Sequence, residues 1–132
     1  MPFSTRQLPG EPIVIATAHS PLKIETDMPE LAKQITEFLQ KIPGKIYYIS
    51  DTSLLDHLEF RDVVIGMAEV TRGPAAFLSN ERLQTIVVGS TQMIQLAVQS
   101  VSQEQYGGLN IVLYSSLDEA IQYARNQIAK GK

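Results

Sequence analysis

The feature that most constrains the fold is a regular alternation of short β-branched runs with longer segments of helical periodicity. β-Branched and aromatic residues favour strands, whereas apolar residues that recur every three or four positions favour amphipathic helices. An alternation of the two requires a largely parallel sheet, because a helix must carry the chain back between parallel strands. We therefore predict an α/β fold whose central strands are residues 13–18, 46–49, 85–88 and 111–114.

An N-terminal hairpin should extend this sheet. Residues 3–8 can form a short strand, and the sequence Pro9-Gly10-Glu11-Pro12 that follows is typical of a turn. We expect residues 3–8 to pair with residues 13–18 through this turn. A brief alternation of apolar and polar residues at 22–25 predicts one more, edge-like strand before the first helix.

The first helix has the clearest boundary signals. Asp27 can cap its N-terminus, Pro29 is tolerated in a first turn, and Glu30 can reach back to the cap, while Pro43 and Gly44 end the helix. Its apolar stripe consists of Met28, Leu31, Ile35, Phe38, Leu39 and Ile42.

Three further helices are expected, which brings the predicted number to about four. One has its apolar face over residues 60–68 and stops near Gly73-Pro74, and a second follows the turn Gly89-Ser90-Thr91, whose hydroxyls can cap it. The last begins after Ser116, which forms a capping box with Glu119.

Length and composition narrow the class of protein. A chain of 132 residues with 44% hydrophobic residues suits one domain, so we predict a single domain over residues 1–132. The net charge of −3 gives no electrostatic reason to expect a nucleic-acid partner. The absence of cysteine excludes disulfides, thiolate catalysis and cysteine-ligated metal sites. No apolar segment approaches the roughly 20 residues of a membrane span, and we expect a cytoplasmic protein.

Polar residues follow the central strands where parallel α/β sheets bind ligands, at the carboxyl ends. Asp51, Thr52 and Ser53 follow one strand, and Ser90 and Thr91 follow the next, so these five residues are the candidates that face a ligand or partner. Ser53 is also a candidate phospho-acceptor. The alternative is structural, since Asp, Ser and Thr commonly satisfy backbone N–H groups in turns and cap helices.

No catalytic constellation emerges from the sequence. The two histidines are His19 and His57, and the Asp-His-x-Glu sequence around His57 matches no recognised metal-ligand spacing. Neither a phosphate-binding loop nor a dinucleotide fingerprint surrounds Gly89. We therefore predict that the protein is not an enzyme, with no catalytic residues, no metal and no cofactor.

The order of elements resembles the SpoIIAA-like group related to STAS domains, which are named for sulfate transporters and anti-sigma-factor antagonists. The resemblance extends from about Ile13 to Gln127, and its best local matches are Ile46–Asp51 and residues 117–120. It implies a mixed, largely parallel sheet under about four helices, in a domain that acts through interaction. Typical STAS antagonists carry an Asp-Ser-Ser/Thr-Gly-Leu motif that a partner kinase phosphorylates. The nearest sequence here, Asp51-Thr52-Ser53-Leu54-Leu55, lacks its glycine, which weakens the case for phosphorylation.

Two functions follow from these observations. The first is a non-catalytic STAS-like regulatory module that binds a protein partner or a second copy of itself as a homodimer. The alternative is a carrier of a small apolar ligand or lipid, with a pocket between helices and sheet near Asp51 and Ser90.

Overall fold

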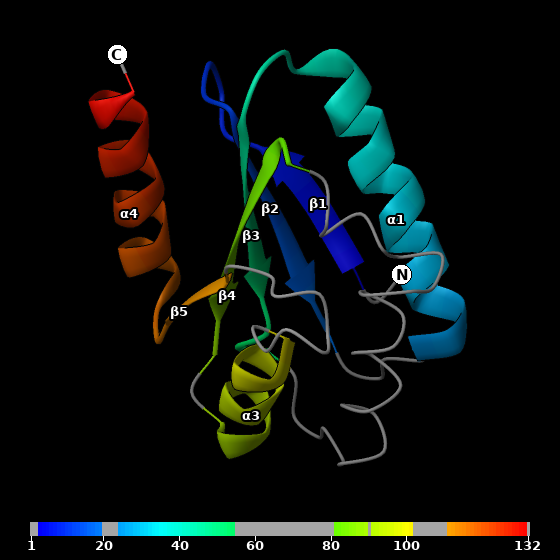
Figure 1. Cartoon of the computed structure of the whole chain (residues 1–132). Helices are drawn as coiled ribbons and strands as arrows, with labels where there is room; N and C mark the ends of the chain where they lie inside the picture. The colour runs from blue at the N-terminus through cyan, green and yellow to red at the C-terminus, as the bar shows by residue number, and fades with distance from the viewer. Residues whose placement is uncertain (1–2, 20–23, 55–80, 90, 102–110, 132) are drawn as a thin grey trace.

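A sheet of five strands forms the centre of the structure, a computed structural model that describes residues 3–19, 24–54, 81–89, 91–101 and 111–131 (Figure 1). The strands lie in chain order: β1 (Phe3–Gln7), β2 (Ile13–Ala18), β3 (Ile46–Asp51), β4 (Leu83–Val88) and β5 (Ile111–Tyr114). β1 pairs antiparallel with β2, and the other three pairings are parallel. The predicted mixed, largely parallel sheet with an N-terminal hairpin is thus confirmed.

Helices cover both faces of the sheet. Within the described ranges they are α1 (Ile24–Lys41), α3 (Gln92–Val101) and α4 (Leu117–Lys130), and α1 and α4 lie on opposite sides of the strands (Figure 1). The helix predicted from about Phe60 to near Gly73-Pro74 lies outside the described residues.

The start of α1 differs from the sequence prediction. Ile24 and Glu25 belong to the helix, so an edge strand at 22–25 is wrong; residues 22 and 23 themselves lie outside the described part. Asp27 therefore does not cap the helix, and Pro29 stands inside it rather than in its first turn. An alternation of only four residues is a weak strand signal. The helix prevails because its 18 residues pack one long apolar face on the sheet, and this packing stabilises its first turn as well.

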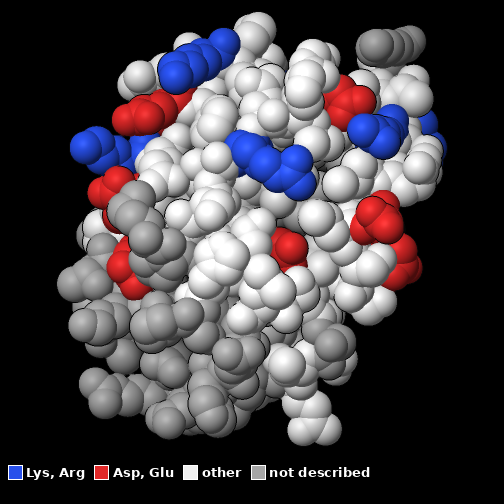
Figure 2. Space-filling model, turned by 180° about the vertical axis from the view of Figure 1, so that it is seen from behind, with Lys and Arg blue, Asp and Glu red and all other residues white. Residues whose placement is uncertain are grey.

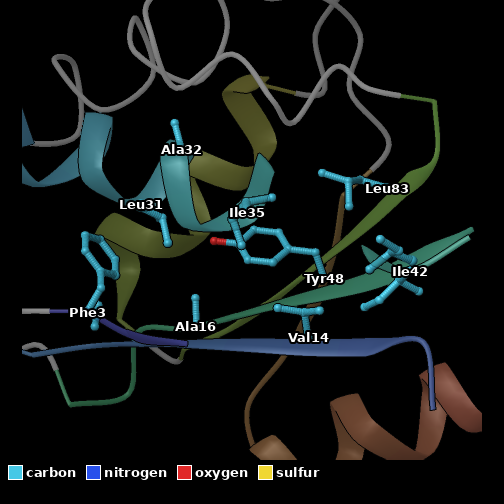
Figure 3. Close-up of a cluster of buried hydrophobic side chains, with 11 residues drawn as sticks. Phe3, Val14, Ala16, Leu31, Ala32, Ile35, Ile42, Tyr48 and Leu83 are labelled. Atoms are coloured by element: carbon cyan, nitrogen blue, oxygen red, sulfur yellow. The ribbon is translucent and has the colours of Figure 1, made fainter. Parts of the chain in front are cut away.

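The core has two layers because successive residues of a strand point to opposite faces. On β2, Val14 and Ala16 point toward α1, whereas Ile13 and Ile15 point toward the face that α4 covers. Figure 3 shows the layer beneath α1, where Leu31 and Ile35 lie close to the ring of Tyr48. Burial raises the pKa of the Tyr48 hydroxyl above its usual value, and a hydrogen bond with Ser50 opposes this shift.

One arginine, at the amino ends of β3 and β4, binds the backbone carbonyls at the C-terminus of α1. The Arg82 guanidinium donates from Nε to the carbonyl of Gly44 at 2.9 Å, from Nη1 to that of Leu39 at 3.0 Å, and from Nη2 to that of Ile42. The last carbonyls of a helix have no partner within it, and a planar, charged donor suits them well. Gly44 turns the chain with a φ of +78°, a conformation that glycine adopts without strain.

The start of α4 was predicted correctly. The Glu119 backbone N–H donates to Ser116 Oγ at 3.3 Å, and the hydroxyls of Ser115 and Ser116 each donate to Glu119 Oε1 at 3.0 Å. The glutamate thus reaches back to the cap through two hydroxyls. Ala120 and Ala124 of this helix are fully buried against the sheet.

Candidate functional site

The carboxyl ends of the central strands lie side by side at one edge of the sheet. Asp51 pairs with Val88, and Val88 pairs with Tyr114, so the segments that follow β3, β4 and β5 begin at the same level. The structure therefore places Asp51, Thr52, Ser53 and Thr91 on segments that leave this edge. Ser90, the fifth candidate, lies outside the described residues.

Asp51 organises the turn after β3. Its side chain is almost buried, with 6% exposed, and Oδ1 accepts from the Ser53 backbone N–H at 3.0 Å and from Ser53 Oγ at 2.6 Å. This is an Asx turn, in which a carboxylate replaces a backbone acceptor two residues from its target. The bonds account for the buried position of Asp51, while Ser53 itself stays exposed.

Thr52 joins β3 to the end of β4. Both its backbone N–H and its Oγ1 donate to the carbonyl of Val88, at 2.9 Å and 2.7 Å. The next residue, Gly89, lies so close that a Cβ added to it would be 2.5 Å from Thr52 Oγ1 and 3.0 Å from Ile94 Cγ2. The threonine is therefore a structural residue that depends on a glycine at position 89.

Thr91 begins α3. Its Oγ1 accepts from the Ile94 backbone N–H at 3.2 Å, and its carbonyl accepts from the Gln95 N–H at 3.1 Å, which is the geometry of a helix N-cap. The side chain of Ile94 is buried and packs near Gly89. The start of α3 therefore lies at the same edge of the sheet as Thr52.

Two exposed apolar side chains at this edge were not predicted from the sequence. Leu54, directly after the Asx turn, is 52% exposed, and Leu96 on α3 is 43% exposed, and they are the large hydrophobic side chains on the surface of the described residues. The sequence suggests a turn at residues 51–53, but it does not show that the leucine after the turn stays on the surface. Leu96 lies outside the apolar face that the sequence gives this helix, which consists of Ile94, Ala97, Val98 and Val101. A leucine off that face is the one sequence signal that points to it.

The described ranges hold no cluster of side chains at this edge that could bind a metal ion. No three residues of the types His, Cys, Asp and Glu are grouped there to hold a metal ion. His19 follows β2 at the same edge, and His57 lies outside the described residues. None of the helices in the described part of the chain is long and apolar enough to cross a membrane.

Charge does not single out one partner chemistry. Figure 2 shows the face opposite to that of Figure 1, where Lys and Arg are interspersed with Asp and Glu among uncharged side chains. Mixed charge of this kind creates no strong field of one sign. The net charge of −3 agrees with that distribution.

The gap that the described side chains leave beneath α1 is too narrow for a water molecule. It is lined by Val14, Ile35, Phe38, Ile46, Tyr48 and Leu83. Ile46 and Leu83 begin their strands, so this gap lies toward the amino ends and away from the edge where a ligand pocket was predicted. It does not test that prediction.

The tyrosines near α4 have packing roles. Tyr114 and Tyr123 lie with their ring centroids 5.6 Å apart, and Lys45 Nζ lies 5.9 Å from the centre of the Tyr47 ring. Burial, and then the neighbouring Tyr123, raise the pKa of the Tyr47 hydroxyl. All three rings pack in the layer between the sheet and α4.

Comparison with known proteins shows the fold. No model of a protein family matches the sequence, and no curated protein matches it. Among solved structures, the chain is similar to an uncharacterized DUF3478 protein with a SpoIIAA-like fold from Shewanella loihica PV-4. The TM-score is 0.60 at 11% identity, over 92% of this chain and 91% of that chain. An anti-sigma factor antagonist from Mycobacterium paratuberculosis has a TM-score of 0.54 at 16% identity, over 93% of this chain and 92% of that chain. The chain thus has the SpoIIAA-like fold that the sequence resemblance implied.

Proposed function

We propose that this chain is a non-catalytic regulatory module that binds a protein partner at the carboxyl edge of its sheet. One observation carries the proposal: a SpoIIAA-like fold exposes two leucines, Leu54 and Leu96, on the segments that leave this edge. The similarity in fold to an anti-sigma factor antagonist supports a role in regulation through protein contact. We place this role in the cytoplasm, as expected from the sequence.

The polar candidates divide into two groups on this proposal. Asp51 and Thr52 hold the turn in shape through bonds to Ser53 and Val88. Ser53 directly precedes Leu54, Thr91 lies five residues before Leu96 (96 − 91), and both are exposed, so they can form the polar rim of an apolar contact. Their hydroxyls also hold local structure, because Ser53 Oγ donates to Asp51 and Thr91 Oγ1 caps α3.

Ser53 is the candidate for regulation by phosphorylation. Its hydroxyl is exposed, but it donates to Asp51 at 2.6 Å, so a phosphate there would stand against a carboxylate. Like charges at that distance repel, and the phosphorylated residue could no longer donate this bond. Phosphorylation of Ser53 would therefore open the turn and displace Leu54 from the contact surface.

The test begins with partner capture from cells that express the chain, followed by reassembly of the complex from purified proteins. We expect Leu54→Glu and Leu96→Glu each to weaken the measured affinity at least roughly tenfold, because a carboxylate cannot be buried in an apolar contact. The matched control is Gln122→Glu, an equal change of charge on the exposed side of α4. Unchanged affinity in both leucine variants would overturn the proposal, provided that circular dichroism shows them folded.

The ligand carrier stays a prediction of the sequence. The narrow gap beneath α1 gives it no support, since even a water molecule does not fit there.

A further inference from the structure

β1 is the last strand of the sheet among the described residues, and it presents backbone groups to its outer side. In an antiparallel pair, the residues bonded to the neighbouring strand alternate with residues whose N–H and C=O groups point away. Leu8 N–H donates to the carbonyl of Ile13 at 3.0 Å, and these residues continue the register in which Arg6 pairs with Ile15 and Ser4 with Thr17. The even-numbered residues of β1 therefore bond to β2, and Phe3, Thr5 and Gln7 direct their backbone groups outward.

These outward groups have no partner among the described residues. β2 is the strand that pairs with β1, and the side chains of Thr5 and Gln7 bond to Gln34 and to the carbonyl of Glu11 without engaging the outer backbone. Ser4 and Arg6 are exposed, so α4 does not cover β1 on their face of the sheet. An open edge of this kind is a template for another strand.

We propose that the edge of β1 pairs with β1 of a second copy of this chain, antiparallel about a two-fold axis at Thr5. In this register Thr5 faces the partner's Thr5, and Phe3 faces the partner's Gln7. All three outward residues of each strand then fall in bonded positions, which gives three pairs with two N–H···O=C bonds each. A five-stranded sheet would become one continuous sheet across the two copies.

Charge favours this register over the one with its axis at Arg6. With the axis at Thr5, Arg6 lies opposite the partner's Ser4, in the non-bonded position where facing side chains come closest. A shift of the axis to Arg6 would place the two arginines directly opposite each other, which is unfavourable. That shift would also leave Phe3 beyond the paired segment.

The expected dimer is weak. A contact of five residues a side falls far below the roughly 20 to 30 residues a side of stable complexes. We therefore expect a dissociation constant on the order of 0.1 mM, and a dimer that forms only as concentration rises. The contact uses none of the candidate partner-facing residues, so it does not depend on the proposed function.

Sedimentation equilibrium of the full chain, from about 10 µM to 1 mM, tests the proposal with two variants of one residue. Thr5→Pro removes an outward N–H and leaves the bonds to β2 intact, since proline is tolerated on the open side of an edge strand. Thr5→Val is the control, because it removes the same hydroxyl but keeps the N–H. We expect the wild type and Thr5→Val to dimerise, and Thr5→Pro to remain a monomer. If Thr5→Pro does not fold, Gln7→Pro removes the neighbouring outward N–H in an exposed residue.

A third variant tests the register. Ser4→Glu places a carboxylate opposite the partner's Arg6 twice in the dimer, which should lower the dissociation constant by roughly 2-fold to 30-fold. Ser4→Lys should raise it. A monomeric wild type at 1 mM, dimers of folded Thr5→Pro as stable as those of the wild type, or equal affinity of Ser4→Glu and Ser4→Lys would each overturn the proposal.

Discussion

At the amino ends of β3 and β4 a single long side chain binds the backbone, whereas at their carboxyl ends several short side chains do so. Arg82 donates to the carbonyls of Leu39, Ile42 and Gly44, more than 35 residues away in the chain. At the other end Asp51 bonds two residues away, and Thr52 bonds to Val88. Beside these short contacts, Ser53 and Leu54 remain exposed.

The side chains at the amino edge therefore stabilise the fold, whereas those at the carboxyl edge also position exposed residues for a partner. A partly buried arginine that donates to three carbonyls spends its hydrogen-bonding capacity on the backbone and so contributes chiefly to stability. A short turn held by one carboxylate contributes less, but it fixes the position of the exposed residues that follow it. Substitutions at the amino edge should therefore change stability alone, and substitutions at the carboxyl edge should divide between stability and binding.

The largest effect is expected at the amino edge. Arg82→Ala leaves the carbonyls at the end of α1 without their charged donor, and we expect the free energy of unfolding to fall by about 2–4 kcal/mol. Urea unfolding of the purified chain measures it. Arg125→Ala is the matched control, because Arg125 is 52% exposed and forms one ion pair with Glu11 at 3.2 Å. Its loss should cost less than about 1 kcal/mol. Equal losses in the two variants would contradict the role assigned to Arg82.

The next effect is expected at the carboxyl edge. Gly89→Ala brings a methyl group within 2.5 Å of Thr52 Oγ1, so the hydroxyl must leave the Val88 carbonyl. We expect a loss of about 2 kcal/mol in the free energy of unfolding. Combination with Thr52→Ala should recover part of this loss, because the clash is then removed. Strictly additive losses in the double-mutant cycle would show that the two residues do not interact as described.

Tyr48, in the core between the two edges, should make the free energy of unfolding depend on pH. Its pKa is raised by burial in the folded chain, while an unfolded tyrosine ionises near pH 10. Above that pH the unfolded state releases a proton that the folded state retains, so stability falls as pH rises, by up to about 1.4 kcal/mol per unit from this residue. Unfolding midpoints from pH 9 to 11.5 measure the slope. Tyr48→Phe should flatten it, and an unchanged slope would place the titrating group elsewhere.

The smallest change in stability is expected at Ser53. Ser53→Ala removes one exposed hydroxyl and keeps the backbone N–H bond to Asp51, so the free energy of unfolding should fall by less than about 1 kcal/mol. Thermal unfolding followed by circular dichroism checks this. A loss comparable to that of Arg82→Ala would remove the distinction between the two edges.

Local signals in the sequence predicted the parts of the fold that depend on local chemistry. The β-branched runs became β2 to β5, and Ser116 with Glu119 began α4, because strand preference and capping act over a few residues. The start of α1 was missed because a four-residue alternation cannot be weighed against packing that forms only in the folded sheet.

In the candidate site, too, the sequence predicted positions but not contacts between distant residues. Asp51, Thr52, Ser53 and Thr91 could be placed near one edge because parallel strands align their carboxyl ends. The contact between Thr52 and Gly89 joins residues 37 positions apart (89 − 52), and it could not be read from either segment alone. The bonds of Arg82 span a similar separation, and no short motif encodes them.

Hydrogen exchange of the full chain, alone and bound to its purified partner, shows which edge of the sheet the partner contacts. We expect partner binding to slow exchange in residues 51–54 and 91–99, while residues 39–46 at the amino edge exchange as they do in the free chain. Protection confined to the amino edge or to the outer side of β1, with residues 51–54 and 91–99 unchanged, would show that the partner does not bind at the carboxyl edge.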